Sequence, residues 1–143
     1  MSDARGVRGY ATFLADVPDD QVEEGGEIVK PGGAAIGELL RASVAQRGLP
    51  TTPLYQHSFY GWAFDVTVGG KTVWCMLQFP DPWLLITDVR ESLLGRLFRG
   101  PSRETHEGVL SILRETLAAA PFRSATWTTR SEYHAQAEAA PTE

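Results

Sequence analysis

The stretch that decides the fold is residues 55–87, which reads YQHSFYGWAFDVTVGGKTVWCMLQFPDPWLLIT. Two apolar-patterned segments flank the dipeptide Gly69-Gly70, and a third follows the turn sequence Pro80-Asp81-Pro82. Two glycines between alternating segments predict a tight hairpin, because only glycine takes positive φ at both central turn positions without strain. The stretch therefore predicts a meander of three antiparallel strands.

A two-residue turn at Gly69-Gly70 also fixes which side chains share a face of the sheet. The pairs predicted on one face are Val68 with Lys71, Val66 with Val73, Phe64 with Cys75, Trp62 with Leu77 and Tyr60 with Phe79. Side chains alternate between the two faces of a strand, and all but one of these pairs are apolar or aromatic. This face is expected to be the core. A register slip of one residue would turn Asp65 inward, so the pattern specifies its own pairing.

The opposite face of the hairpin is unusually apolar for a solvated surface. The apolar island predicted there consists of Phe59, Ala63, Trp74 and Met76, extended by Trp83 or Leu84 from the third segment. Large apolar patches on a protein surface usually mark an interface or a groove. Three interpretations remain open: the face is covered within the chain, it joins two copies of the chain, or it binds a partner or ligand.

The rest of the chain adds helices and two further strands around the meander. Apolar spacing and turn residues predict strands over residues 9–17 and 124–129 and helices over residues 34–46, 90–98 and 103–120. This order favours an α+β fold of two layers, an antiparallel sheet with the central meander (about 55–87) and the helices packed on one face. We expect a single domain over residues 1–131. Residues 132–143 lack apolar periodicity and are expected to be a disordered tail.

Residues 16–27 are strongly acidic and contain no lysine or arginine. Their six carboxylates belong to Asp16, Asp19, Asp20, Glu23, Glu24 and Glu27. Mutual repulsion favours a solvated loop, and the EF-hand ligand spacing for calcium is absent. The functional alternative is an acidic surface that faces a basic partner, with Asp19, Asp20, Glu23 and Glu24 as its candidates.

Composition limits the classes of protein that the chain can belong to. With 143 residues, 43% hydrophobic and 22% charged, it is typical of one globular domain. The net charge of −5 has the wrong sign for generic binding of nucleic acid or of an anionic membrane. No signal-peptide segment follows the N-terminus, so the expected localisation is cytoplasmic. The single cysteine, Cys75, lies on the predicted core face and is interpreted as a small hydrophobic residue.

The chain shows no recognisable catalytic set, and no metal or cofactor is expected. His57 is predicted to lie on one continuous strand with Asp65, about 26 Å away and out of reach. His106 is predicted to face solvent in the first turn of a helix, and His134 falls in the tail. No His-x-x-x-His or Cys-x-x-Cys pattern indicates a zinc site.

A cleft at the sheet edge is the alternative site for a small enzyme or small-ligand binder. Its candidates are His57, Asp81, Asp88, Arg90 and Arg96. All of them except His57 have a simpler interpretation: Asp81 as part of a turn, Asp88 as a helix cap, and the arginines as a solvated surface with interleaved glutamates.

The function that the sequence favours is therefore non-catalytic. We expect a protein-binding module, of the bacterial inhibitor or immunity type, that acts through the aromatic sheet face, first through Phe59, Trp74 and Met76. The partner would be another protein or a second copy of the chain. A small enzyme and a homodimeric structural protein are the alternatives.

Overall fold

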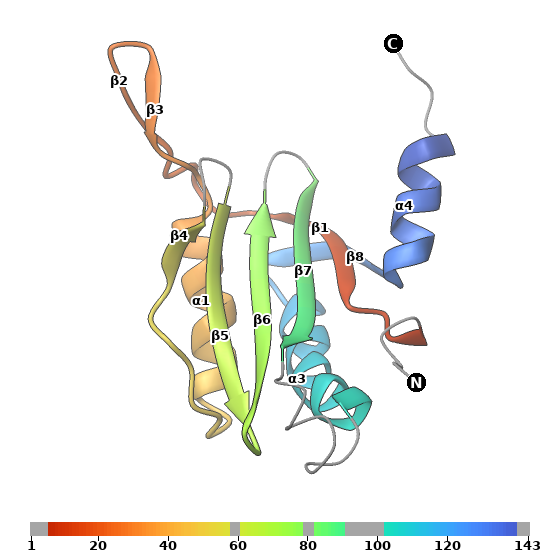
Figure 1. Ribbon diagram of the computed structural model, residues 1–143. Coiled ribbons are helices and arrows are strands. Elements are labelled where there is room, and N and C mark those ends of the chain that lie inside the picture. Colours follow the sequence, from red (N-terminus) through yellow and green to blue (C-terminus); the bar gives the residue numbers. More distant parts are fainter. Residues whose placement is uncertain (1–5, 58–60, 79–81, 91–101, 140–143) are drawn as a thin grey trace.

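The computed structural model describes residues 6–57, 61–78, 82–90 and 102–139, and its main sheet has six antiparallel strands in the order β4-β5-β6-β7-β1-β8. These strands are β1 Tyr10–Ala15, β4 Tyr55–His57, β5 Gly61–Val68, β6 Lys71–Gln78, β7 Trp83–Arg90 and β8 Phe122–Thr128. Helices α1 (Ala34–Ala45) and α3 (Ser102–Leu117) contact one face of this sheet and lie behind it in Figure 1. The predicted α+β class is confirmed, with α1 and α3 on one face of the antiparallel sheet.

The hairpin at Gly69-Gly70 has the predicted register. The two glycines have φ of 56° and 84°, the left-handed values that a two-residue turn of type I′ requires. The confirmed pairs are Val68 with Lys71, Val66 with Val73, Phe64 with Cys75 and Trp62 with Leu77. The fifth predicted pair, Tyr60 with Phe79, lies outside the described residues.

The core lies between this face of the sheet and the two helices. Its large, fully buried side chains include Phe13, Phe64, Leu85, Leu40, Leu113 and Leu117. Cys75 is completely buried, as its predicted place on the core face requires, and burial raises the pKa of its thiol. Lys71, the polar member of the predicted core face, is also buried at the end of the hairpin.

One part of the meander prediction is wrong. Residues 55–57 do not continue β5 but form the separate strand β4, which pairs antiparallel with β5 through Tyr55 with Ala63 and His57 with Gly61. A Cβ at Gly61 would lie 2.3 Å from the carbonyl oxygen of Leu77, so the start of β5 requires glycine. Because β4 and β5 are neighbours, the predicted separation of about 26 Å between His57 and Asp65 along one strand does not apply.

The acidic segment is also more ordered than predicted. Strands β2 (Val22–Glu24) and β3 (Glu27–Lys30) form a separate two-stranded sheet around Gly25-Gly26, whose φ values are 61° and 83°. This turn uses the same two-glycine geometry as the central hairpin. Figure 1 shows the small sheet projecting away from the body of the molecule.

The C-terminal end differs from the prediction as well. Helix α4 (Arg130–Ala139) occupies most of the segment that was expected to be a disordered tail. Thr129 and Glu132 explain why it begins there: the Glu132 amide donates to Thr129 Oγ1 over 3.1 Å, and the Thr129 amide donates to Glu132 Oε1 over 2.8 Å. This reciprocal pair is a capping box. Of the helix predicted over residues 90–98, Arg90 belongs to β7 and the remainder lies outside the described residues.

Candidate functional site

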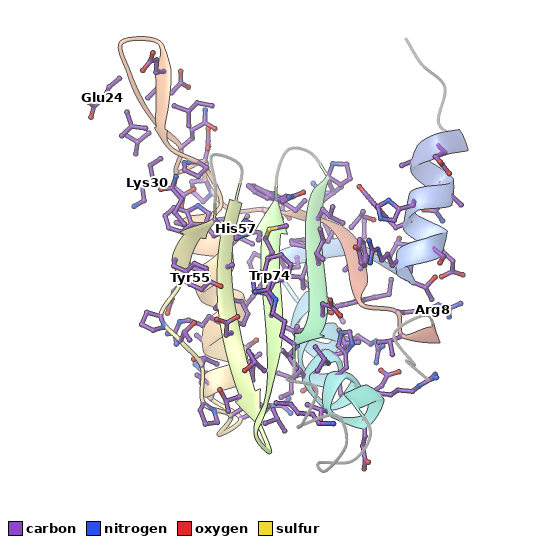
Figure 2. The ribbon with its side chains drawn as sticks, viewed as in Figure 1. Arg8, Glu24, Lys30, Tyr55, His57 and Trp74 are labelled. Carbon is purple, nitrogen blue, oxygen red and sulfur yellow. The ribbon has the colours of Figure 1, made fainter. Side chains whose placement is uncertain are left out.

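Four neighbouring strands bring six side chains together on the sheet face that α1 and α3 leave uncovered. We call this group the Trp74 cluster: Tyr55 and His57 of β4, Asp65 of β5, Trp74 of β6, and Asp88 and Arg90 of β7. Residues that are directly opposed on adjacent strands share a face. Trp74 is opposed to Asp65 on one neighbouring strand and to Asp88 on the other, so acidic residues flank it on both sides. Figure 2 labels Tyr55, His57 and Trp74 on this face.

The indole of Trp74 is contacted by a cation and by an imidazole. The guanidinium carbon of Arg90 lies 4.4 Å from the ring centroid, and the ring of His57 meets it edge-on with centroids 5.3 Å apart. The Tyr55 hydroxyl lies 3.4 Å from Asp65 Oδ2. Partial burial raises the pKa of Tyr55, and the Asp65 carboxylate adds to the rise. Nδ1 of His57 is buried and has no hydrogen-bond partner among the described residues.

The predicted apolar island is smaller than the sequence suggests. Ala63 and Met76 do lie on this face, but they are 0% and 5% exposed and offer a partner almost no surface. Trp74 is half-buried. Trp83 is wrongly placed by the prediction, because it is opposed to the buried Phe13 and packs against the core on the helix side. Leu84, opposed to Gln78, is on the open face, and Phe59 lies outside the described residues.

The candidates for a cleft at the sheet edge divide into two groups. His57 and Arg90 contact Trp74 and Asp88 is opposed to it on β7, a grouping that no motif in the sequence predicts. Asp88 lies inside β7 and is not a helix cap. Asp81 and Arg96 lie outside the described residues.

The second surface is the projecting hairpin, residues 22–30, which we call the hairpin arm. Every residue of β2 and β3 is exposed. Val22, Ile28 and Val29 are 41%, 42% and 51% exposed, and they are three of the five exposed large hydrophobic residues in the described part of the chain. Glu24 and Lys30 are labelled on the arm in Figure 2. The arm therefore presents apolar and acidic side chains together.

The base of the hairpin arm is held firmly on both sides. On the β2 side, the Asp20 carboxylate accepts hydrogen bonds from the amides of Gly33 (2.7 Å) and Ala35 (2.8 Å) at the start of α1. On the β3 side, Trp62 Nε1 donates to the carbonyl of Pro31 over 3.0 Å, and Lys30 Nζ lies 5.5 Å from the Trp62 ring centroid. The arm is thus a projection from a fixed base.

These contacts sort the four acidic candidates into two roles. Asp20 caps α1, and Asp19 Oδ1 accepts from the Gln21 amide over 3.0 Å, so both carboxylates are used in the fold. Glu23 and Glu24 lie on the hairpin arm, where Glu23 accepts a hydrogen bond from the Gln21 side chain. Only these two remain as candidates for contact with a partner.

A third polar group is buried between the sheet and α3. Thr87 Oγ1 donates to the Gly9 carbonyl over 2.9 Å and lies 2.6 Å from His106 Nε2, so Nε2 of the neutral imidazole carries the proton and donates. Burial lowers the pKa of His106, against the opposing effect of Asp88 and Glu107. His106 is 5% exposed, so the prediction that it faces solvent is wrong.

The comparisons with known proteins assign no function to these surfaces. No protein-family model matches the chain, and no curated protein or solved structure matches it significantly. Within the described ranges, no three His, Cys, Asp or Glu side chains gather as a metal site would require. None of the described helices is long and apolar enough to span a membrane.

Proposed function

We propose that this chain is a protein-binding module whose primary contact element is the hairpin arm. The observation that carries the proposal is the arm's exposure: all of its strand residues face solvent, and they include Val22, Ile28 and Val29. An isolated two-stranded hairpin is marginally stable in water. Apolar side chains on such an element gain free energy only when another surface covers them.

The backbone of the arm supports the same proposal. In a two-stranded sheet each strand has one edge whose N–H and C=O groups face outward, and such edges bind a further strand by β-augmentation. Glu23, Glu24 and Glu27 line this arm, and a register shift interrupts its pairing after Val22. Charges and bulges are the devices that limit indiscriminate edge pairing. The combination favours a selective contact with a protein partner.

The charge of the arm indicates what kind of protein fits. Residues 22–30 carry three glutamates and one lysine, and the whole chain has a net charge of −5. Two copies of so acidic an arm repel each other, whereas a partner with basic side chains around an apolar groove is attracted. An inhibitor or immunity-type module that blocks a basic partner protein is the class of function that we favour.

A double substitution on the arm tests the proposal. Replacing Ile28 and Val29 by aspartate should abolish capture of the partner that the wild-type chain retains from its native cells, identified by mass spectrometry. Leu39→Asp is the matched control, because Leu39 is 43% exposed but lies on α1. The L39D variant should capture the same partner as the wild type.

Two results would contradict the proposal. Unchanged capture by the folded I28D/V29D variant would remove the arm from the interface. Equal loss in the arm variant and in L39D would indicate a general effect of added charge. Light scattering on the purified chain distinguishes a homodimer from a complex with another protein. If the wild type is a dimer and the arm substitutions dissociate it, the partner is a second copy of the chain.

A further inference from the structure

We propose that the Trp74 cluster is a binding site for a guanidinium group, the arginine side chain of the partner protein. The inference rests on the proposed function and extends it, because it assigns a chemistry to the sheet face beside the hairpin arm. The β4–β5 end of the sheet links the two surfaces: Trp62 of β5, which holds the base of the arm from the helix-covered face, is opposed to Gln56 of β4, and the neighbours Tyr55 and His57 belong to the cluster on the other face.

The first observation is that the site already holds a cation. Arg90 places its guanidinium carbon 4.4 Å from the centroid of the Trp74 ring, within the range of a cation–π contact. Arg90 itself is exposed, so its side chain can leave the ring without unfolding the sheet. We infer that Arg90 occupies, in the free protein, the position that a partner's arginine takes in the complex.

The second observation is the arrangement of charge around the ring. Asp65 and Asp88 are opposed to Trp74 on the two neighbouring strands, and both lie on the ring's side of the sheet. Two carboxylates beside an aromatic face favour a cation over an anion or an apolar group. Arginine fits better than lysine because its planar guanidinium both stacks on an aromatic ring and pairs with carboxylates.

The third observation is that two further ring side chains, those of His57 and Tyr55, lie beside Trp74 and are partly exposed. His57 meets the ring edge-on at 5.3 Å, and Tyr55 is 37% exposed next to Asp65. Trp74 is half-buried, so part of its side chain remains accessible beside Arg90 and His57. An aromatic ring with carboxylates around it is the arrangement that recognises cationic groups in proteins.

The test removes the resident cation and supplies a free one. Arg90→Ala vacates the ring, and N-acetyl-arginine methylamide is titrated into the variant while the indole N–H resonance of Trp74 is followed by NMR. We expect saturable shifts in R90A and about two- to fivefold weaker binding in the wild type, the factor that an exposed cation–π contact contributes. The neutral isostere N-acetyl-citrulline methylamide should produce no saturable shift in either protein.

Two further variants show which groups bind the probe. Trp74→Leu in the R90A background should abolish the response, and Trp74→Phe, which keeps an aromatic ring, should restore part of it. In these variants the amide resonances of residues 72–76 report the binding. Asp65→Asn with Asp88→Asn should weaken binding of the arginine probe without changing the fold, which the same spectra monitor.

The outcomes separate this inference from the proposed function. Equal shifts with the arginine and citrulline probes, or no gain in affinity in R90A, would overturn the guanidinium site even if the arm substitutions abolish partner capture. If the titration behaves as expected while the arm substitutions leave capture intact, the guanidinium site stands and the role of the arm fails.

Discussion

At the scale of single residues, His106 and Thr87 form a polar contact that is buried inside the protein. Thr87 donates to the Gly9 carbonyl and accepts from His106, so one hydroxyl of β7 joins α3 to the residue that precedes β1. Gly9 is confined by the same pair: a Cβ there would lie 2.7 Å from Thr87 Oγ1 and 3.0 Å from the imidazole. The sequence held a signal for this burial, because His106 falls at helical spacing with the buried Val109, Leu110 and Leu113.

The hydroxyl of Thr87 can be removed with little change of shape. In Thr87→Val the Gly9 carbonyl keeps its bond from the Thr87 backbone amide, but His106 Nε2–H loses its acceptor inside the protein. We expect the free energy of unfolding to fall by about 1–3 kcal/mol, the cost of one unsatisfied buried donor. Urea unfolding measures it. Thr67→Val, at an exposed position of β5, should change stability by less than about 0.5 kcal/mol.

His106 also makes the stability depend on pH. Burial lowers its pKa below the ordinary 6.5, so between the folded and unfolded pKa values the unfolded chain binds more protons. The free energy of unfolding therefore rises with pH across that window. The contribution of neutral His106 is fully present above pH 6.5 and is lost as the pH falls from 6.5 toward the lowered pKa. Urea midpoints at about pH 5 to 7 should follow this slope. In His106→Gln the slope should flatten, and an unchanged slope would assign it to other groups.

At the scale of elements, local motifs in the sequence indicate a second hairpin and a C-terminal helix, whereas the composition of the same segments favours a loop and a tail. Gly25-Gly26 has the same turn chemistry as Gly69-Gly70, but the acidic run around it was interpreted as a loop. The capping box of Thr129 and Glu132 indicates a helix start, but the Ala- and Glu-rich sequence that follows was interpreted as a tail. Local hydrogen-bonding signals were more informative here than hydrophobic periodicity, because both elements are mostly exposed.

The Trp74 cluster is different, because no local signal predicts it. The hairpin register correctly places Trp74 opposite Asp65, and β7 adds Asp88. The contact with His57 depends on the antiparallel pairing of β4 with β5, whereas the alternation of the sequence predicts one continuous strand there. Contacts of this kind are set by tertiary packing, which overrides local propensity.

Among the described helices, α4 is expected to be the first to loosen in acid. Most side chains of α4 are exposed. Three contacts hold the helix: the capping box, an ion pair of 3.4 Å between the Arg8 guanidinium and the Glu132 carboxylate, and the packing of Tyr133 on Tyr10, whose ring centroids lie 5.4 Å apart. Hydrogen bonding to the Thr129 backbone and the contact with Arg8 lower the pKa of Glu132 below 4.5. The contribution of Glu132 is therefore present above pH 4.5 and lost as the pH falls through the lowered pKa.

Amide hydrogen exchange of residues 130–138 measures this loosening. Protection should decrease when the pH is lowered from neutral to about 3 while α1 stays protected, since exposed ends open locally before the core does. Thr129→Ala should reproduce the loss at neutral pH, because an N-cap Thr→Ala change costs about 1 kcal/mol, and Thr129→Ser should not. Equal exchange in both variants would mean that the capping box does not hold the helix.

At the scale of the whole molecule, folding and the proposed binding function use separate sets of apolar side chains. The core is built from the helix-facing side of the sheet with α1 and α3, whereas the hairpin arm contributes no residue to it. Its apolar side chains are 41–51% exposed, so they add less to the free energy of unfolding than the fully buried side chains of the core. Val22, Ile28 and Val29 stay outside the core, and the proposed function assigns them to the contact with the partner.

The separation predicts that stability and partner binding can be changed independently. Ile28→Asp with Val29→Asp should alter the free energy of unfolding by less than about 0.5 kcal/mol, as for other exposed sites, while it removes partner capture. Leu113→Ala, in the core, should cost about 2–5 kcal/mol. At temperatures where this variant is still folded, its affinity for the partner should be unchanged, because Leu113 is completely buried in the core and does not belong to the arm. Thermal unfolding and binding isotherms on the three proteins measure both quantities. A large loss of stability in the arm variant would show that the arm packs within its own chain, and its apolar residues would then need no partner to explain them.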